Sequence, residues 1–223
     1  MSSTRRGRLT GWERDPGDRY WTPPELADVL VDRLDILPGD HVLEPSVGGG
    51  AFARAANKQC VAAWAEARSG ALGRLVVCDV DDSAPGLVEG EAVVGDFLSY
   101  RPDCRFDWII GNPPYRQALA HVEYALELGD RIAFLLRLAF LESSARYAFW
   151  QAHPCRQIYV LAERPSFLGN GKHDSTAYAF FVWDDTHPGP TRIDVISWRG
   201  DSRSSVVDAG SPFVGIDIEL AGV

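Results

Sequence analysis

Short apolar segments alternate with helix-like segments along most of this chain, and this alternation constrains the fold more than any other feature. Such alternation is typical of a mostly parallel α/β sheet, because each helix returns the chain to the same end of the sheet. The sequence predicts seven strands: His41–Glu44, Leu75–Asp79, Ala92–Asp96, Phe106–Ile110, Arg131–Leu138, Arg156–Glu163 and Thr176–Trp183. A Gly-rich loop too short for a crossover helix joins the last two strands, so we expect this pair to be antiparallel.

Helices are predicted at three places. The segment Thr22-Pro23-Pro24-Glu25 matches a capping box with proline in the first turn, and apolar residues then recur on one face as far as Leu34. The turn Pro38-Gly39-Asp40 ends that pattern. Two longer helical segments are Ala51–Ala67 and Ser143–His153.

The chain length favours a single domain, because 223 residues bury one good core and hardly two. We expect a basic, flexible arm at residues 1–19, one α/β domain at residues 20–186, and an extension of unassigned role at residues 187–223. The extension holds one strand-like segment, Ile193–Trp198.

Several kinds of site and location are disfavoured by the composition. No apolar run approaches the ~20 residues of a membrane span, and the N-terminus lacks the apolar core of a signal peptide. We therefore expect a cytoplasmic protein with no membrane partner. The four cysteines are far apart and form no CxxC pair, so we expect neither a disulfide framework nor a metal site.

The net charge of −9 argues against a protein that coats nucleic acid, since phosphate contacts need clustered Lys and Arg. Two local basic groups remain compatible with phosphate contact. One is the arginine-rich N-terminus, and the other is the later loop with Arg164, Lys172 and His173. The alternative for both groups is solvated surface, which is the usual fate of short charge runs.

The tetrapeptide Asn112-Pro113-Pro114-Tyr115 follows an apolar strand at the edge where a parallel sheet presents its ligands. The amide oxygen of Asn112 and the backbone carbonyl of Pro113 are two fixed acceptors for the hydrogens of a planar amino group. Such acceptors favour a pyramidal nitrogen whose lone pair faces an electrophile. Tyr115 supplies a flat face for a planar substrate. The alternative is an ordinary Pro-rich turn after a strand.

A second group of residues suggests a nucleoside cofactor. The first strand ends in Glu44-Pro45-Ser46-Val47-Gly48-Gly49-Gly50-Ala51-Phe52, a Gly-rich turn that opens into a helix and lets a ligand approach the backbone. Asp79 closes the second strand, where a carboxylate can accept hydrogen bonds from ribose hydroxyls. The pair Asp96-Phe97 offers a carboxylate and a ring to adenine, and Glu44 offers a carboxylate to a cationic group. Solvation of strand ends is the alternative for both aspartates.

In their order along the chain, these segments resemble the S-adenosylmethionine-dependent amino-methyltransferases with an NPPY motif, and among them the gamma-type adenine-N6 DNA methyltransferases. The resemblance extends from about Tyr20 to Trp183. It implies a Rossmann-like seven-stranded sheet in the order 3-2-1-4-5-7-6, S-adenosyl-L-methionine as the cofactor, and catalysis by Asn112, Pro113, Pro114 and Tyr115. The cofactor-binding residues that it implies are Tyr20, Trp21, Thr22, Pro23, Glu44, Pro45, Ser46, Gly48, Gly50, Phe52, Asp79, Val80, Asp96, Phe97 and Asn112.

The expected activity is methyl transfer to the exocyclic amino group of adenine in DNA. Phe167 is expected to form a second wall opposite Tyr115, because a flipped base needs two faces; a core position for Phe167 is the alternative. Gamma-type enzymes usually have a recognition domain after the catalytic core, and only about forty residues follow the last predicted strand. The chain thus resembles small, stand-alone phage-type enzymes, and low specificity, the Phe167 loop or a specificity partner are all open.

Three other functions compete with this expectation. A glutamine-N5 methyltransferase acting on a protein faces the same electronic problem and uses the same tetrapeptide, although its glycine motif differs from the one at Glu44. Methylation of an RNA base is a second alternative. A cofactor-binding module without activity is the third, and the intact motif at Asn112 argues against it.

Overall fold

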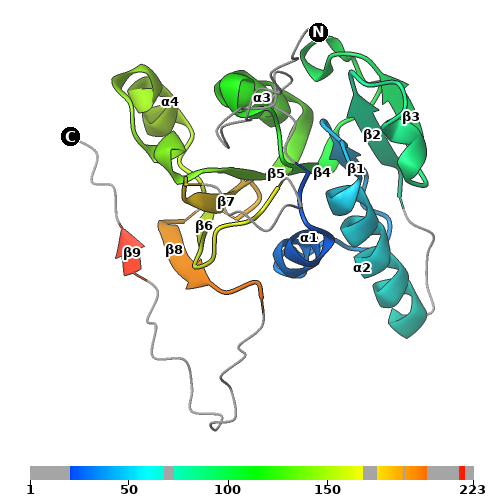
Figure 1. Ribbon diagram of the computed structural model, residues 1–223, viewed down its shortest axis with the longest axis horizontal. Coiled ribbons are helices and arrows are strands. Elements are labelled where there is room, and N and C mark those ends of the chain that lie inside the picture. The colour runs from blue at the N-terminus through cyan, green and yellow to red at the C-terminus, as the bar shows by residue number, and fades with distance from the viewer. Residues whose placement is uncertain (1–20, 68–72, 168–174, 188, 200–215, 219–223) are drawn as a thin grey trace, which may run out of the picture.

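The computed structural model describes residues 21–67, 73–167, 175–187, 189–199 and 216–218, which form one open sheet with helices on both faces (Figure 1). The described residues give nine strands in the order β3-β2-β1-β4-β5-β7-β6-β8-β9. The strands are β1 (Val42–Glu44), β2 (Leu75–Asp79), β3 (Glu91–Val94), β4 (Phe106–Gly111), β5 (Gly129–Arg137), β6 (Gln157–Leu161), β7 (Tyr178–Asp184), β8 (Thr191–Ile196) and β9 (Ile216–Ile218).

The pairing of the strands confirms the predicted order and the antiparallel last pair. Strands β3, β2, β1, β4 and β5 run parallel to one another. Strand β7 lies between β5 and β6 and runs antiparallel to both. The sheet is wider than the seven strands expected, because β8 adds to β6 in parallel and β9 adds to β8 in antiparallel orientation. The extension after residue 187 thus continues the same sheet.

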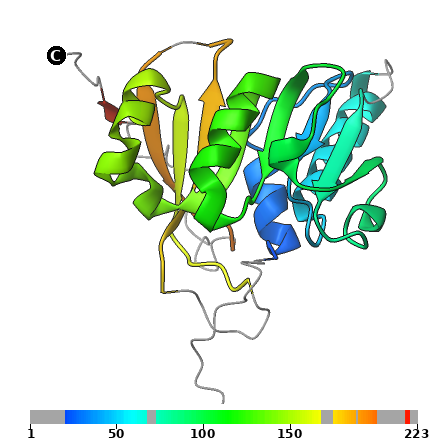
Figure 2. The same cartoon turned by 90° about the horizontal axis from the view of Figure 1, so that it is seen from above.

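Helices α1 (Pro24–Val31) and α2 (Ala51–Ala67) cover one face of the sheet, and α3 (Ala118–Leu128) and α4 (Tyr147–Ala152) cover the other (Figure 1). In the view from above, α3 and α4 lie in front of the strands (Figure 2). The central strand β5 therefore buries side chains on both sides, with Leu135 in one core cluster and Phe134 and Leu136 in the other. This explains why the central strands are continuous apolar runs.

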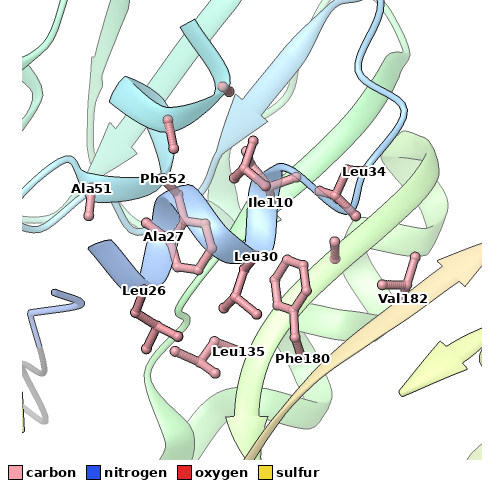
Figure 3. Close-up of a cluster of buried hydrophobic side chains, with 14 of the residues drawn as sticks. Leu26, Ala27, Leu30, Leu34, Ala51, Phe52, Ile110, Leu135, Phe180 and Val182 are labelled. Carbon is pink, nitrogen blue, oxygen red and sulfur yellow. The ribbon is translucent and has the colours of Figure 1, made fainter. Parts of the chain in front are cut away.

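The core under α1 and α2 positions the segments that carry the site. Figure 3 shows Leu26 and Leu30 of α1 and Phe52 of α2 directed toward Leu135 and Phe180 of the sheet. The rings of Phe52 and Phe180 stack with centroids 5.8 Å apart and an interplanar angle of 13°. Each such side chain contributes about 1.5–3 kcal/mol on burial, so α1 and α2 are fixed against the sheet.

Two helical regions differ from the prediction. The sequence analysis did not anticipate α3, which provides the crossover between the parallel strands β4 and β5. The helix expected at Ser143–His153 begins as a 3-10 turn, η5 (Ser144–Arg146), and continues as the short α4. Further 3-10 turns are η1 (Pro85–Leu87), η2 (Phe97–Ser99), η3 (Tyr115–Gln117) and η4 (Leu138–Leu141).

The predicted capping box at the start of α1 is wrong. Pro23 is the N-cap residue, no side chain caps the helix, and Pro24 is the first helical residue. The Thr22 hydroxyl instead accepts a hydrogen bond from the Asn112 side chain, 90 residues later. The Thr22 side chain thus makes a tertiary hydrogen bond instead of capping the helix.

No helix in the described part of the chain is both long and apolar enough to cross a membrane. The same residues contain no group of three or more His, Cys, Asp or Glu side chains arranged to hold a metal ion.

Candidate active site at the carboxyl edge of the sheet

The strand order reverses between β1 and β4, and the predicted site residues lie at that point. From β1 the chain moves through β2 to β3 on one side, and β4 lies on the other side of β1. Ligands of open α/β sheets bind outside the carboxyl ends of the strands at such a reversal. The glycine turn follows β1, Asp79 ends β2 and Asn112 follows β4. The topology therefore brings three predicted segments to one edge.

The glycine turn after β1 is tied to the end of β2. The backbone N–H of Val47 donates to the Cys78 carbonyl at 3.0 Å, and the N–H of Gly48 donates to Asp79 Oδ2 at 2.8 Å. Gly48 and Gly50 have φ values of +46° and +72°, which residues with a Cβ rarely adopt. The turn therefore requires glycine at both positions and holds its backbone close to Asp79.

Trp21 lies over the outer side of this turn. A Cβ built on Gly48 would be 3.7 Å from the Trp21 ring, and one built on Gly49 would be 3.9 Å from it. The indole is 65% exposed, so it covers the turn without being part of the core. Trp21 is thus an exposed apolar ring packed over the glycine turn.

Asp79 accepts hydrogen bonds on both carboxylate oxygens. Besides the Gly48 N–H on Oδ2, the Asp81 N–H donates to Oδ1 at 3.0 Å. Each carboxylate oxygen has a second lone pair, so both can still accept from a ligand hydroxyl. Val80, the next residue, has 75% of its surface exposed beside this carboxylate. An apolar side chain next to a fixed acceptor suits an adenosine ligand.

Glu44 is a buried carboxylate beneath the turn. The side chain is 2% exposed, and its Oε2 accepts the N–H of Ala53 at 2.7 Å. Burial raises the pKa of Glu44 well above its usual range, and the Ala53 hydrogen bond and the charge of Arg54 offset this only in part. A buried carboxylate with so little compensation attracts a cationic ligand.

The pair Asp96-Phe97 divides between surface and core. Asp96 is exposed and its Oδ1 accepts the Leu98 N–H at 3.0 Å, which caps η2. Phe97 is only 2% exposed and packs against His121 and Tyr124, with centroids 5.4 and 5.1 Å away. This differs from the expectation that the Phe97 ring faces adenine, because α3 covers it. The unpredicted α3 is the reason for the difference.

Asn112 follows β4 and is fixed by the segment ahead of α1. Its Nδ2 donates to the Thr22 hydroxyl at 3.1 Å. With the amino group directed at Thr22, the amide oxygen points to the other side. The side chain is half-buried, and Gly111 before it packs against Glu44. Asn112 is thus held to the segment ahead of α1, next to a strand end that packs against Glu44.

The rest of the tetrapeptide forms a rigid turn. Pro113 is buried, and Pro114 has φ −55° and ψ 121° ahead of η3. Burial raises the pKa of the Tyr115 hydroxyl well above its usual range. The hydroxyl therefore stays protonated at physiological pH, and Tyr115 presents a neutral ring.

Phe167 lies beside Tyr115 but not opposite its face. The two rings meet edge-on, with centroids 6.5 Å apart and an interplanar angle of 61°. Phe167 is 7% exposed and also meets the edge of Tyr178 at 5.0 Å. A sandwich for a base needs two roughly parallel faces. In this structure Phe167 has the core position that the sequence analysis kept as the alternative.

Arg137 is a site residue that the sequence analysis missed. It ends β5, and its guanidinium carbon lies 4.9 Å from the centroid of the Tyr115 ring. The available signal was a charged residue at the end of the apolar run Ile132–Leu136, at the same sheet edge.

The remaining predicted residues support the site to different degrees. Pro23 is the N-cap residue of α1, and Pro45 and Ser46 lead into the glycine turn. Phe52 is 1% exposed and belongs to the core, which separates it from a ligand at the turn. Tyr20 lies outside the described residues.

Comparison with known proteins confirms a resemblance to methyltransferases. No protein-family model matches the chain. A type II methyltransferase, M.CvrRI, of Paramecium bursaria Chlorella virus XZ-6E is 32% identical over 112 residues, which are 48% of this chain and 27% of that protein. The type II methyltransferase M.TthHB8I of Thermus thermophilus is 30% identical over 146 residues, which are 65% of this chain and 32% of that protein. The matched parts thus span less than a third of each relative.

The fold has close counterparts among solved structures. The M protein of the type I restriction enzyme EcoKI superposes with a TM-score of 0.62 over 81% of this chain and 49% of that protein, at 13% identity. At this identity the match concerns the fold. The chain is therefore similar in sequence to type II methyltransferases and in fold to the methyltransferase protein of a type I restriction enzyme.

Proposed function

We propose that this chain transfers a methyl group from S-adenosyl-L-methionine to the exocyclic amino group of adenine in DNA. The observation that carries the proposal is the position of Asn112 beside the glycine turn, with its amide orientation fixed by Thr22. This arrangement puts a polar acceptor next to a nucleoside-type site at the reversal of strand order. The two type II relatives support methyl transfer as the reaction, and DNA as the acceptor is taken from the resemblance of the motif order to adenine-N6 DNA methyltransferases.

The residues of the edge fit the cofactor. Apart from their chain neighbours, Trp21 is the one described residue within 4 Å of a Cβ built on Gly48 or Gly49, so little of the described structure hinders the approach of a ligand to this backbone. Asp79 is placed for ribose hydroxyls, and buried Glu44 compensates a positive charge. When bound, S-adenosyl-L-methionine supplies an electrophilic methyl group on a sulfonium.

The chain's own contribution to transfer is to hold and polarise the acceptor. The Asn112 amide oxygen and the Pro113 carbonyl each accept one hydrogen of the amino group, which directs the nitrogen lone pair toward the cofactor side. Neither acceptor takes a full proton before attack. The neutral ring of Tyr115 stacks on the base and excludes water from the reacting nitrogen.

Selection of a target sequence requires more than the described residues. The described helices and strands belong to the sheet and its covering layers, and the matched regions of the type II relatives are a minor part of those proteins. We therefore expect that a further segment or a separate specificity partner selects the target sequence.

The assay for this function uses the full chain, methyl-labelled cofactor and equal masses of DNA, RNA and protein in separate reactions. Label in DNA supports the proposal. Label in protein indicates the glutamine-N5 alternative, label in RNA indicates an RNA base methyltransferase, and either result in the absence of DNA labelling rejects the proposal.

A further inference from the structure

The end of β8 is bound to the start of the loop that follows β6. The two strands pair as far as Leu161 and Ile196. Beyond that pair, the Ser197 hydroxyl donates to Glu163 Oε1 at 2.8 Å, and the Trp198 N–H donates to Glu163 Oε2 at 3.2 Å. The indole Nε1–H of Trp198 donates to the Glu163 backbone carbonyl at 2.9 Å. Ser197 and Trp198 therefore hold this glutamate by both its side chain and its backbone.

This contact lies at the carboxyl edge of the sheet, where the candidate active site is. Strand β7 is antiparallel to both β5 and β6, so β5 and β6 run in the same direction, and β8 is parallel to β6. Strands β1 and β4 also run in the direction of β5. Residues 197–199 of the extension thus belong to the edge that carries the site.

The loop held by this contact reaches the proposed catalytic segment. Phe167 follows Glu163 closely in the chain and meets the edge of the Tyr115 ring, with centroids 6.5 Å apart. Pro165 between them is buried, and its own ring fixes φ. Trp198 is 8% exposed and belongs to the same core cluster as Phe167. A short, packed segment therefore connects the end of β8 to Tyr115.

We propose that Ser197 and Trp198 are positioning residues, which hold the loop after β6 and, through it, the Tyr115 ring for the acceptor base. Glu163 receives their hydrogen bonds, and Phe167 transmits the position of the loop to Tyr115. The inference rests on the proposed function, because it takes Tyr115 as the residue that stacks on the base. Neither positioning residue touches the substrate or the cofactor in this account.

The contact should affect binding of the acceptor and leave binding of the cofactor unchanged. Gly48 and Asp79, which are proposed to bind the cofactor, are joined to each other at the ends of β1 and β2. Strands β4, β5 and β7 separate β1 from β6 and β8 in the sheet. Stacking by Tyr115 acts before and during the transfer, so a loosened ring raises the KM for the acceptor rather than lowering kcat.

The test measures methylation of a short single-stranded oligo(dA) by the full chain at saturating S-adenosylmethionine. Ser197→Ala removes one donor to Glu163, and Trp198→Phe removes the indole donor but keeps an aromatic ring. Each variant should raise the KM for oligo(dA) about threefold to tenfold, the effect of one lost hydrogen bond, with kcat within about twofold of the unmodified chain. Calorimetry should show an unchanged affinity for S-adenosylhomocysteine.

Thr191→Val is the matched control, because it loosens the same pair of strands at the opposite edge of the sheet. The Thr191 hydroxyl at the start of β8 donates to the Cys155 carbonyl, ahead of β6, at 2.6 Å. The control removes one hydroxyl donor, as Ser197→Ala does, and should keep the KM for oligo(dA). Chemical denaturation of all three variants measures the stability that each one loses, so an effect of stability alone appears in the control as well.

The edge at which the hydrogen bond is removed must decide the result. Equal KM values for oligo(dA) in Ser197→Ala and Thr191→Val would show that β8 only stabilises the sheet. A loss of S-adenosylhomocysteine affinity as large as the rise in KM would show the same, and either result overturns the inference. In both cases, methylation of oligo(dA) by the unmodified chain leaves the proposed function standing. If the unmodified chain methylates no DNA, the proposed function fails and the inference fails with it.

Discussion

At the scale of single residues, the proposed chemistry depends on Asn112, whose side chain donates a hydrogen bond to Thr22. The Thr22 hydroxyl accepts the Asn112 amino group at 3.1 Å. Thr22→Val keeps the shape but removes the acceptor, so we expect the transfer rate to fall about tenfold, the effect of one lost hydrogen bond. Thr22→Ser keeps the hydroxyl and should keep most of the rate. Single-turnover kinetics at saturating cofactor measure both, and an unchanged rate in Thr22→Val would contradict this role.

Glu44 makes the stability of the cofactor-free protein depend on pH. Burial raises the pKa of Glu44 in the folded state, so the folded protein holds this proton more tightly than the unfolded chain does. Stability linked to this group is complete below the unfolded pKa of about 4.3 and is lost as pH rises through the folded pKa. The glutamine side chain in Glu44→Gln does not titrate, so it makes no such pH-dependent contribution to stability.

The stabilisation of Glu44→Gln over the unmodified chain should therefore grow as pH rises from the unfolded pKa of about 4.3 toward the raised folded pKa. Thermal unfolding of both proteins without cofactor across that range measures it. Affinity for S-adenosylmethionine should fall in the variant, because the sulfonium loses a buried counter-charge. A stability difference that is constant with pH would show that Glu44 does not titrate differently on folding.

The positions of these residues could be predicted because they follow strand ends. Asp79 ends β2 and Asn112 follows β4, and parallel strands bring such ends to one edge. Side-chain surroundings could not be predicted in the same way. Phe97 is covered by α3, and Arg137 reaches Tyr115 from a strand end that pairs with β7. Both contacts depend on packing between elements distant in sequence.

At the scale of elements, the glycine turn between β1 and α2 is under steric constraint. Gly50 has φ +72°, and a Cβ at this position would lie 2.6 Å from Val88 Cγ1 and 2.9 Å from Arg54 Nη1. Gly50→Ala therefore combines backbone strain with overpacking, and it should lower the free energy of unfolding by about 2–4 kcal/mol. Chemical denaturation measures this change.

Gly86 is the matched control for this substitution. A Cβ built on Gly86 meets nothing within 4 Å, and its φ is not positive. Gly86→Ala should change stability by less than about 1 kcal/mol. Equal effects of the two substitutions would show that the turn after β1 is not under steric constraint.

A helix or strand could be predicted where the sequence signal for it lies within the element itself. Strands β2, β4 and β5 were located to within two residues because burial on both faces makes them continuous apolar runs. Helix α3 escaped prediction because it follows the tetrapeptide through η3 and has no side-chain cap at Gln117. The capping box predicted at Thr22 does not form, because the Thr22 hydroxyl makes a tertiary contact with Asn112 instead.

At the scale of the whole molecule, the net charge of −9 limits the affinity that we expect for nucleic acid. Three described arginines belong to the acceptor side: Arg116 follows Tyr115, Arg137 ends β5 and Arg164 follows β6 at the same edge. With about three phosphate contacts, the logarithm of affinity for single strands should fall with the logarithm of salt concentration with a slope of about −2. Titrations of oligo(dA) across a salt series measure the slope.

The weak affinity expected for nucleic acid also predicts a preference for unpaired adenines. Adenines in single strands avoid the flipping cost of a few kcal/mol, so they should be methylated faster than paired adenines. Matched single-stranded and duplex oligonucleotides compare the two rates. Tight, sequence-specific methylation of duplex DNA by this chain alone would contradict the prediction and would show that the chain itself contains the recognition element.

The most direct test of the account is the identity of the methylated atom and its dependence on Asn112. DNA treated with the unmodified chain and with Asn112→Ala is digested to nucleosides, and the methylated product is identified by mass spectrometry, with cofactor affinity of both proteins measured by calorimetry. We expect N6-methyladenine from the unmodified chain. We also expect a loss of about a hundredfold or more in Asn112→Ala at near-normal cofactor affinity. Undiminished methylation by Asn112→Ala, or a methyl group on any atom other than the adenine amino nitrogen, would contradict the account.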